Sequence, residues 1–323
     1  MSNAIVIERT GGPEVLVLGE HDPGAPGAGQ LRIRIAAAGV NFIDVYFRTG
    51  LYPRPLPFVA GLEGAGHVEA VGAGVGDFGV GDRVAWASAP GSYAESVVAP
   101  AASVVRVPDA VADDVAAAVM LQGMTAHYLV HAIRSPERGG WALVHAAAGG
   151  TGLLLVQTAK RAGLRVIGTC GSAEKAALAA GAGADVVVRY DEADFVAAAR
   201  AATGGRGVDV VYDGVGRDTF DGSLACLRPR GLLAIFGQAS GPVPAFDLQR
   251  LNAGGSLVVT RPSLAHFVAT REELEMRAGA VLAAVADGSL HARIGARFPL
   301  AKAAEAHRAL EARETTGKLL LVP

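Results

Sequence analysis

One segment, residues 141–170, constrains the fold of this chain more than any other. An apolar strand from Trp141 leads into a glycine turn with the spacing Ala147-x-Gly149-x-x-Gly152, and an apolar helix and a β-branched strand follow. In a chain with 43 glycines, such spacing also arises by chance. The prediction of a dinucleotide-binding unit therefore depends on the strand before the turn and on the helix and strand after it. In a βαβ unit of this kind, helix N–H groups face the pyrophosphate of a dinucleotide. The candidate pyrophosphate contacts are Gly149, Gly150, Thr151 and Gly152.

The end of the second strand indicates which dinucleotide binds. NAD requires an acidic residue for its ribose 2′-hydroxyl about twenty residues after the glycine turn, and the strand here ends without one. Hydroxyls, backbone amides and one cation suit a 2′-phosphate instead, which predicts NADPH. Lys175 either binds that phosphate or is a solvated helix residue beside Glu174. The candidate contacts are Thr169, Gly171, Ser172, Lys175 and, after a third strand, Tyr190.

Length and composition favour a cytoplasmic protein of two domains. The chain has 323 residues, more than one core usually supports, and 51% of them are hydrophobic. Its longest apolar runs are interrupted well before the roughly 18 residues of a membrane helix, and no signal-like segment precedes them. The formal net charge is −2 with both signs interspersed, so we expect neither a membrane nor a nucleic-acid partner.

The pattern of elements divides the chain into three segments. Residues 1–123 contain short β-like runs between Gly/Pro turns, which predicts a β-barrel-like domain. Residues 124–261 alternate helices and strands, which predicts a doubly wound parallel sheet of six strands, an α/β Rossmann fold. Residues 262–323 contain helices and a last strand that we expect to return to the first domain. The six strands are expected at 141–146, 165–170, 185–188, 208–212, 231–236 and 256–260.

Motifs along the whole chain resemble those of one family, the zeta-crystallin-type quinone oxidoreductases of the medium-chain dehydrogenase/reductase superfamily. Its members pair a GroES-like β-barrel catalytic domain with a Rossmann domain. Two departures stand out: Gly140 replaces a usual acid or amide, and Gly214 replaces a usual serine. The matching motifs are Gly11-Gly-Pro-Glu-Val-Leu16, Gly39-Val-Asn41-Phe-Ile-Asp44-Val-Tyr46, Gly50-Leu-Tyr52-Pro53, Gly81-Asp-Arg-Val84, Ala147-Ala-Gly-Gly-Thr-Gly152 with Gln157, Val211-Tyr-Asp213-Gly-Val-Gly216, Leu251-Asn-Ala-Gly-Gly-Ser256 and Thr260-Arg-Pro-Ser263.

The zinc sites of that superfamily are not expected here. The chain has only two cysteines, Cys170 and Cys226, too few for a four-thiolate site. Alcohol dehydrogenase relatives have a catalytic cysteine where this chain has Gly39-Val-Asn41, and Gly-His-Glu where it has Gly61-Leu62-Glu63. The histidines show no ligand spacing, so we expect no metal and no Lewis-acid oxidation of alcohols. These histidines are His67, His127, His131 and His145.

Without a metal, the resemblance implies hydride transfer from NADPH to a quinone or an α,β-unsaturated carbonyl. It places Asn41, Tyr46 and Tyr52 around the nicotinamide and the substrate, Asn41 in contact with the cofactor as well. The alternative is that the tyrosines only pack under the loop to Pro53. Asp44 and Glu63 are expected to make structural hydrogen bonds. Further candidate cofactor contacts are Thr125, Val215, Phe236 and Gly237. Arg261 near the sheet end and Lys318 at the last strand either touch the cofactor or close the cleft.

Three alternatives remain open at this stage. The chain is either such a reductase, an enoyl-thioester reductase, or a nucleotide-binding structural protein of the lens-crystallin kind with little turnover. The segment 255–260 is apolar, β-prone and last in the predicted sheet. By the resemblance, it is expected to pair with its copy in a homodimer, unless a helix or loop covers the edge in a monomer.

Overall fold

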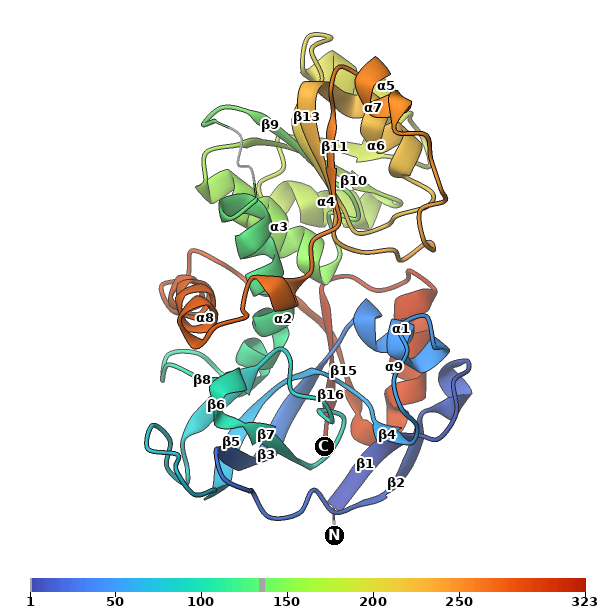
Figure 1. Ribbon diagram of the computed structural model, residues 1–323. Coiled ribbons are helices and arrows are strands. Elements are labelled where there is room, and N and C mark those ends of the chain that lie inside the picture. The colour runs from blue at the N-terminus through green and yellow to red at the C-terminus, as the bar shows by residue number, and fades with distance from the viewer. Residues whose placement is uncertain (1, 134–136) are drawn as a thin grey trace. The chain divides into compact units, whose positions relative to one another are not determined.

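The computed structural model describes residues 2–133 and 137–323 (Figure 1). It contains two compact units. One, the α/β unit, is Thr125–His266, and the other, the β unit, combines Met1–Met124 with Phe267–Pro323. One helix, α2 (Asp113–His131), contains the boundary between them. In the part of the chain that the structure describes, no helix has the length and apolar character needed to cross a membrane.

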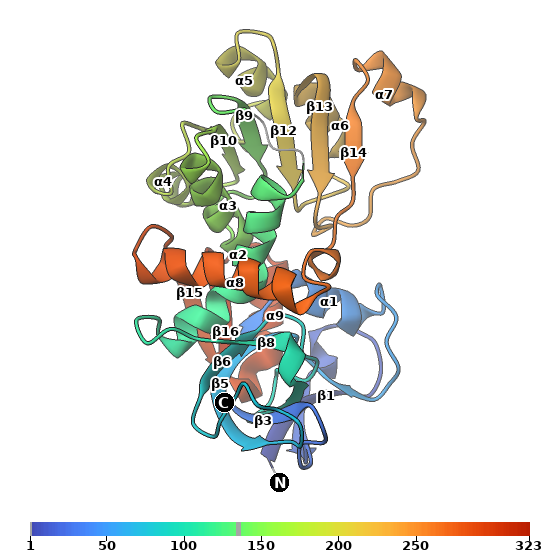
Figure 2. The same ribbon diagram turned by 60° about the vertical axis from the view of Figure 1, so that its left-hand side comes forward.

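The α/β unit is built on a six-stranded parallel sheet of order β11-β10-β9-β12-β13-β14, which confirms the predicted doubly wound fold. Its central strands are apolar and buried on both faces, as expected where helices cover a parallel sheet. Figure 2 shows β12, β13 and β14 in this order, with α6 and α7 in the same unit. The strands are β9 (Trp141–Val144), β10 (Arg165–Cys170), β11 (Val186–Arg189), β12 (Val208–Asp213), β13 (Leu227–Ile235) and β14 (Val258–Thr260), and the helices are α3 (Gly150–Arg161), α4 (Ala173–Gly181), α5 (Phe195–Ala202), α6 (Phe220–Cys226) and α7 (Gln249–Ala253).

The strand order reverses at β9, which pairs with β10 on one side and with β12 on the other. In open α/β sheets, ligands bind outside the carboxyl ends of the strands at such a switch point. The glycine turn follows β9 directly, so the fold places it where a dinucleotide is expected.

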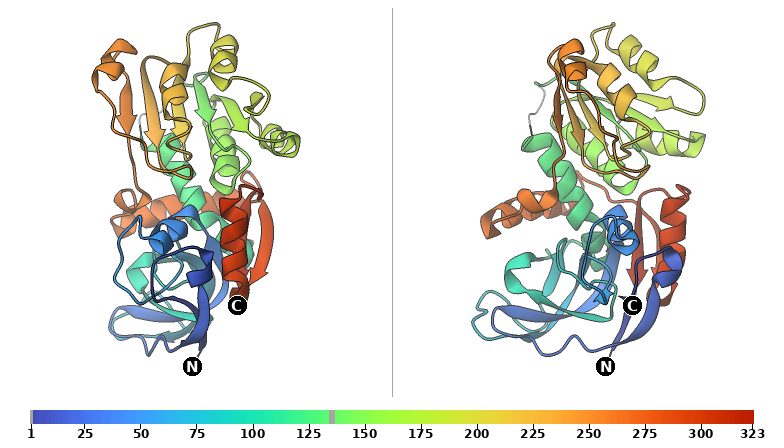
Figure 3. Two further views of the ribbon diagram at one scale, coloured as in Figure 1. Left: turned by 90° about the vertical axis from the view of Figure 1, so that its right-hand side faces the viewer. Right: turned by 45° about the vertical axis from the view of Figure 1, so that its right-hand side comes forward.

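The β unit contains a seven-stranded sheet of order β15-β16-β3-β5-β6-β8, with β7 paired to β3, and a three-stranded sheet of order β2-β1-β4. Strand β16 pairs antiparallel with β3, so the C-terminal strand lies in the unit formed by the N-terminus, as Figure 3 shows in red and blue. The strands are β1 (Ser2–Ile7), β2 (Val17–His21), β3 (Gln30–Val40), β4 (Phe58–Val59), β5 (Glu63–Val71), β6 (Arg83–Trp86), β7 (Ser96–Pro100), β8 (Val104–Arg106), β15 (Ile294–Pro299) and β16 (Lys318–Val322), and the helices besides α2 are α1 (Phe42–Thr49), α8 (Arg271–Ala286) and α9 (Ala303–Glu311).

We expect strand β14 to form the seam of a homodimer. It is the last strand of the sheet, it pairs with β13 alone in the described structure, and Val258 is 40% exposed. Sedimentation at micromolar concentration should show a species of two chain masses, and Val258→Lys should shift it to monomers because a charge then lies at the seam. Val80→Lys, at an exposed position outside the strands, is the control. A single-chain species in the unaltered protein contradicts the prediction.

Candidate active site and cofactor site

The glycine turn presents a helix start that is open to an anion. Helix α3 begins at Gly150, and its N-cap residue Gly149 is extended and provides no side-chain cap. A Cβ at Gly152 would lie 2.2 Å from the carbonyl oxygen of Ala146, which itself has φ 50°. Only glycine at this position therefore lets the helix approach the strand end. The turn places the four candidate contacts, Gly149 to Gly152, at one helix start and fits a pyrophosphate.

The ends of β10 and β11 bring together the residues predicted for the 2′-phosphate. The side chain of Ser172 caps α4 by accepting from the backbone N–H of Lys175, so Lys175 lies in the first turn of that helix. A Cβ at Gly171 would lie 2.5 Å from the hydroxyl oxygen of Tyr190, a residue that is 53% exposed. The Tyr190 ring therefore lies against Gly171, and both adjoin the start of α4.

Thr169 differs from its neighbours, because its hydroxyl is buried in a chain of hydrogen bonds. Thr169 Oγ1 lies 2.9 Å from His145 Nδ1, and His145 Nε2 lies 3.0 Å from Ser223 Oγ. Ser223 Oγ donates to Asp213 Oδ2, and Asp213 Oδ1 accepts from the backbone N–H of Val215. The Asp213 carboxylate can only accept, so Ser223 uses its hydroxyl proton to donate to it. Ser223 must then accept from His145, which places a proton on His145 Nε2. Burial lowers the pKa of His145, in keeping with a neutral ring.

The loops after β12 and β13 hold three further candidates close together. Val215 follows Asp213, while Phe236 and Gly237 both donate their backbone N–H to the Asp213 carbonyl. A Cβ at Gly237 would lie 2.5 Å from the carbonyl oxygen of Gly214, and a Cβ at Gly214 would lie 3.0 Å from the Phe236 ring. The glycine that replaces the usual serine at position 214 therefore leaves room for that ring.

Two remaining candidates of the α/β unit lie apart from these loops in sequence. Thr125 is 7% exposed in α2, and Arg261 follows β14 with its Nη1 donating to the carbonyl oxygen of Pro262. The Arg261 charge acts on the hydroxyl of Tyr128, whose pKa burial nevertheless raises.

In the β unit, Asn41 is the hub of a buried cluster. Asn41 is the N-cap residue of α1 and is 4% exposed. Its Nδ2 donates to the carbonyl oxygen of Gly39 at 3.2 Å and to Glu63 Oε2 at 2.8 Å. Its Oδ1 accepts from Lys318 Nζ at 2.7 Å and from Gln122 Nε2 at 3.3 Å. Lys318 and Glu63, predicted from the sequence for separate roles, thus meet at Asn41.

Tyr46 and Tyr52 lie together at the other end of α1. Their ring centroids are 5.2 Å apart with an edge-on angle of 64°, and the Tyr52 backbone N–H donates to the carbonyl of Tyr46. The chain turns between them at Gly50, whose φ of 81° favours glycine. Helix α1 therefore carries Asn41 at its start and the two tyrosines around its end.

Asp44 begins a second buried chain of hydrogen bonds, in keeping with the structural role expected for it. Its Oδ2 accepts from the Asn41 backbone N–H at 2.9 Å and from the Tyr93 hydroxyl at 3.0 Å. Tyr93 also lies 3.2 Å from His307 Nε2, and His307 Nδ1 accepts from Arg48. Burial raises the pKa of Asp44 to about 7, and burial with the Arg48 charge lowers the pKa of His307 to about 3. Within the described residues, no donor reaches Asp44 Oδ1.

The residues at the family's zinc position do not fit a zinc ion. Both oxygens of Glu63 are engaged, Oε1 by the Leu121 backbone N–H and Oε2 by Lys318 and Asn41. Across residues 2–133 and 137–323, His, Cys, Asp and Glu side chains form no group of three or more suited to a metal. A cation, the Lys318 ammonium, already neutralises the carboxylate.

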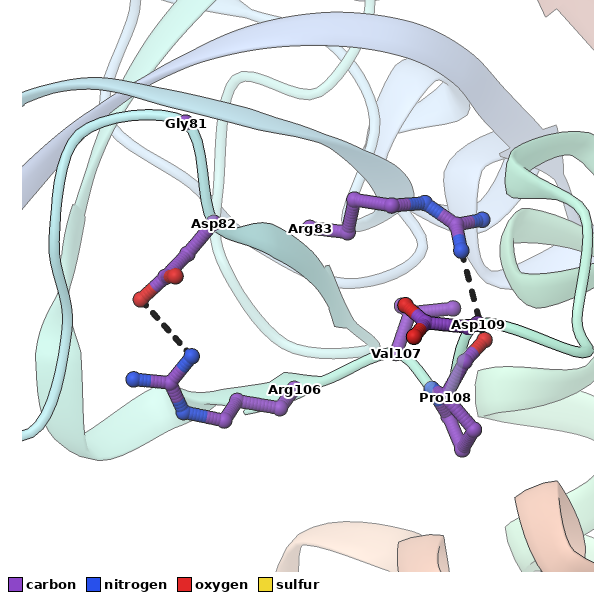
Figure 4. Close-up of a pocket in the computed structure, with 7 residues that line it drawn as sticks. All are labelled: Gly81, Asp82, Arg83, Arg106, Val107, Pro108 and Asp109. Atoms are coloured by element: carbon purple, nitrogen blue, oxygen red, sulfur yellow. Dashed lines mark hydrogen bonds and ion pairs between the residues drawn. The ribbon is translucent and has the colours of Figure 1, made fainter.

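One surface pocket lies in the β unit away from the candidate residues (Figure 4). Its arginines are paired: Arg106 with Asp82 at 2.8 Å and Arg83 with Asp113 at 2.7 Å. With these charges satisfied, we assign it no part in the chemistry. It is lined by Gly81, Asp82, Arg83, Arg106, Val107, Pro108 and Asp109.

Comparison with known proteins identifies the class. An alcohol dehydrogenase GroES-like domain matches residues 27–109, and a family described as zinc-binding dehydrogenase matches residues 150–278. A quinone oxidoreductase of Pseudomonas aeruginosa is 46% identical, and a 2-haloacrylate reductase of a Burkholderia species is 44% identical; each comparison covers this chain completely and at least 99% of the relative.

Two solved structures are similar over 99% of this chain and 100% of their own, each with a TM-score of 0.97: a mycobacterial protein complexed with NADPH at 52% identity, and the Escherichia coli quinone oxidoreductase complexed with NADPH at 42%. The fold and the matches define a medium-chain dehydrogenase/reductase. Within that class, this chain belongs to the quinone oxidoreductase family, as the sequence motifs predicted.

The raised pKa of Asp44 predicts a specific pH dependence of stability. The Asp44 carboxyl binds its proton more tightly in the folded protein than in the unfolded chain. Its contribution to the free energy of unfolding is therefore complete below the unfolded pKa near 3.8 and is lost as the pH rises through about 7. Asp44→Asn should therefore gain about 1–3 kcal/mol in free energy of unfolding, relative to the unaltered protein, between about pH 5 and pH 8. Urea denaturation measures this difference, with Asp77→Asn as an exposed control. Parallel pH curves for Asp44→Asn and the unaltered protein would refute it.

Proposed function

We propose that this protein transfers hydride from NADPH to a conjugated carbonyl acceptor, a quinone or an α,β-unsaturated carbonyl compound. One combined observation supports the proposal most. Helix α3 starts at a glycine turn without a side-chain cap, and the end of β10 provides Ser172 and Lys175 but no acidic residue of the kind typical of NAD sites. Similarity to two proteins solved with NADPH supports the same cofactor.

The α/β unit supplies the binding side of this reaction. The N–H groups of Gly150, Thr151 and Gly152 at the start of α3 hold the pyrophosphate. Gly171, Ser172, Lys175 and Tyr190 hold the 2′-phosphate at the ends of β10 and β11, while Val215, Phe236 and Gly237 hold the nicotinamide half. Bound NADPH supplies a hydride from its nicotinamide C4.

The β unit supplies the reaction side. The acceptor ring lies by the tyrosine pair, Tyr46 and Tyr52, whose ring faces exclude water from a flat conjugated molecule. Charge that develops on the acceptor oxygen needs a hydrogen-bond donor, for which a tyrosine hydroxyl or a water suffices. Asn41 fixes the position of α1, since its amide is held on every side.

A second acceptor class has its own support. The 44% identity to a 2-haloacrylate reductase favours a small α,β-unsaturated acid as an alternative to a quinone. A structural protein without turnover is disfavoured, because Asn41, Tyr46 and Tyr52 are all present, whereas a site without a reaction is free to lose them.

The test of the proposal is NADPH oxidation with a panel of acceptors in the presence of a chelator. The panel contains 1,4-benzoquinone, 9,10-phenanthrenequinone, 2-chloroacrylate, a simple enone and crotonyl-CoA. We expect turnover with at least one quinone or unsaturated carbonyl, unchanged by chelation. Turnover with crotonyl-CoA alone would show an enoyl-thioester reductase, and no turnover with any acceptor would refute the proposal.

Lys175→Ala should weaken NADPH binding selectively. The change removes the one cation at the start of α4, so NADPH should lose about 1–3 kcal/mol of binding free energy while NADH changes little. Calorimetric titration of both cofactors measures this, with Lys302→Ala in the β unit as the control. Equal affinities of the unaltered protein for NADPH and NADH would show that the phosphate site is misassigned.

A further inference from the structure

The C-terminal strand brings a buried cation to Asn41. Lys318 is the first residue of β16 and is 2% exposed, and Glu63 is fully buried. The Lys318 ammonium donates to Asn41 Oδ1 at 2.7 Å and forms an ion pair with Glu63 Oε2. Its charge is therefore directed into the β unit at a carboxylate and an amide.

The backbone of residue 39 is shaped around this ion pair. Strands β16 and β3 pair so that Leu320 lies opposite Gly39. A Cβ at Gly39 would lie 2.3 Å from Glu63 Oε2 and 2.8 Å from Lys318 Cε. Both atoms belong to buried side chains held by hydrogen bonds, so an alanine at position 39 would displace the pair.

The amide of Asn41 has no free hydrogen-bonding position. An asparagine side chain has two N–H donors and two acceptor positions. The donors are used by Gly39 and Glu63, and the acceptor positions by Lys318 and Gln122. Asn41 therefore has no N–H left to donate to a substrate carbonyl while this cluster is intact.

Glu63 also reaches helix α2. Its Oε1 accepts the backbone N–H of Leu121 at 2.6 Å, one residue before Gln122. The ion pair thus joins β16 and β5 to the start of α1 and to the part of α2 that lies in the β unit. Both charged groups therefore contact Asn41, the N-cap residue of the helix that carries Tyr46.

We propose that Lys318 and Glu63 are positioning residues for the reaction at α1: their ion pair sets the orientation of the Asn41 amide and the start of that helix, and Lys318 acts on Asn41 rather than on the cofactor. The inference rests on the proposed function for its kinetic consequence. Displacement of a reacting group by about 1 Å is enough to slow a reaction by about a hundredfold, while the binding of a cofactor held elsewhere is unaffected.

The experiment must separate positioning from stability, because loss of one partner strands a buried charge. The main variant is therefore the double change Lys318→Met with Glu63→Gln, which removes both charges and leaves an oxygen for the Leu121 N–H. Lys318→Arg tests rescue by a conservative cation. The matched control is Lys302→Met with Glu305→Gln, an exposed ion pair three residues apart.

Three readouts are compared after thermal melting shows that each variant folds. We expect the double variant to keep its Kd for NADPH within about threefold and to lose about 30-fold or more in the rate of hydride transfer, with partial recovery in Lys318→Arg. The side-chain amide signals of Asn41 in ¹⁵N-labelled protein should shift and exchange faster with solvent. The control should change none of these.

Two outcomes of the binding and rate measurements overturn the proposal. A rise of about tenfold or more in the Kd for NADPH would make Lys318 a cofactor contact. An unchanged rate of hydride transfer would make the ion pair an element of stability alone. If the unaltered protein reduces no acceptor, the proposed function fails by itself, and the Asn41 signals still decide whether the pair orients that amide: unchanged signals in the double variant refute it.

Discussion

The close approach of α3 to the end of β9, which only glycine at position 152 permits, is the contact on which the α/β unit depends. The carbonyl oxygen of Ala146 lies where a side chain at position 152 would be, so any larger residue would force the start of α3 away from the end of β9. The strand order reverses at the same place. The anion site therefore follows from backbone geometry, and side chains such as Ser172 and Lys175 add the choice between cofactors.

Both units support their candidate residues with buried hydrogen-bond chains that end at a carboxylate. In the α/β unit Asp213 fixes the direction of the chain through Ser223 and His145. In the β unit Glu63 is held by Lys318, Asn41 and Leu121. A buried carboxylate is costly unless its partners are present, so each chain restricts its neighbours to one arrangement. The elements that carry the candidate residues are thereby held in place by charged groups inside each unit.

Sequence reasoning succeeded where the signal is local. The glycine turn, the six strands and the acid-free end of β10 each lie within a short segment, and the fold confirms the sheet that they imply. The partners of Asn41 were not predictable, because Gln122 and Lys318 are 81 and 277 residues away. Helix α2 continues through Gly123, a residue that weakens helices, because the missing side chain there lets Val281 pack closely. The hydrogen-bond chain from His145 through Ser223 to Asp213 was not predictable either, because its members lie far apart in the sequence.

The most direct test of this account follows the hydride itself. NADPH is labelled with deuterium at one or the other of its two C4 positions and is mixed with excess enzyme and a reducible quinone for a single turnover. Mass spectrometry then measures the deuterium content of the NADP⁺ formed. The account predicts that the label is lost from one C4 position and fully retained from the other, with a slower reaction for the label that is lost, because a fixed site presents one face of the nicotinamide. Loss of label from both positions alike, or reduction of the quinone without consumption of NADPH, would contradict it.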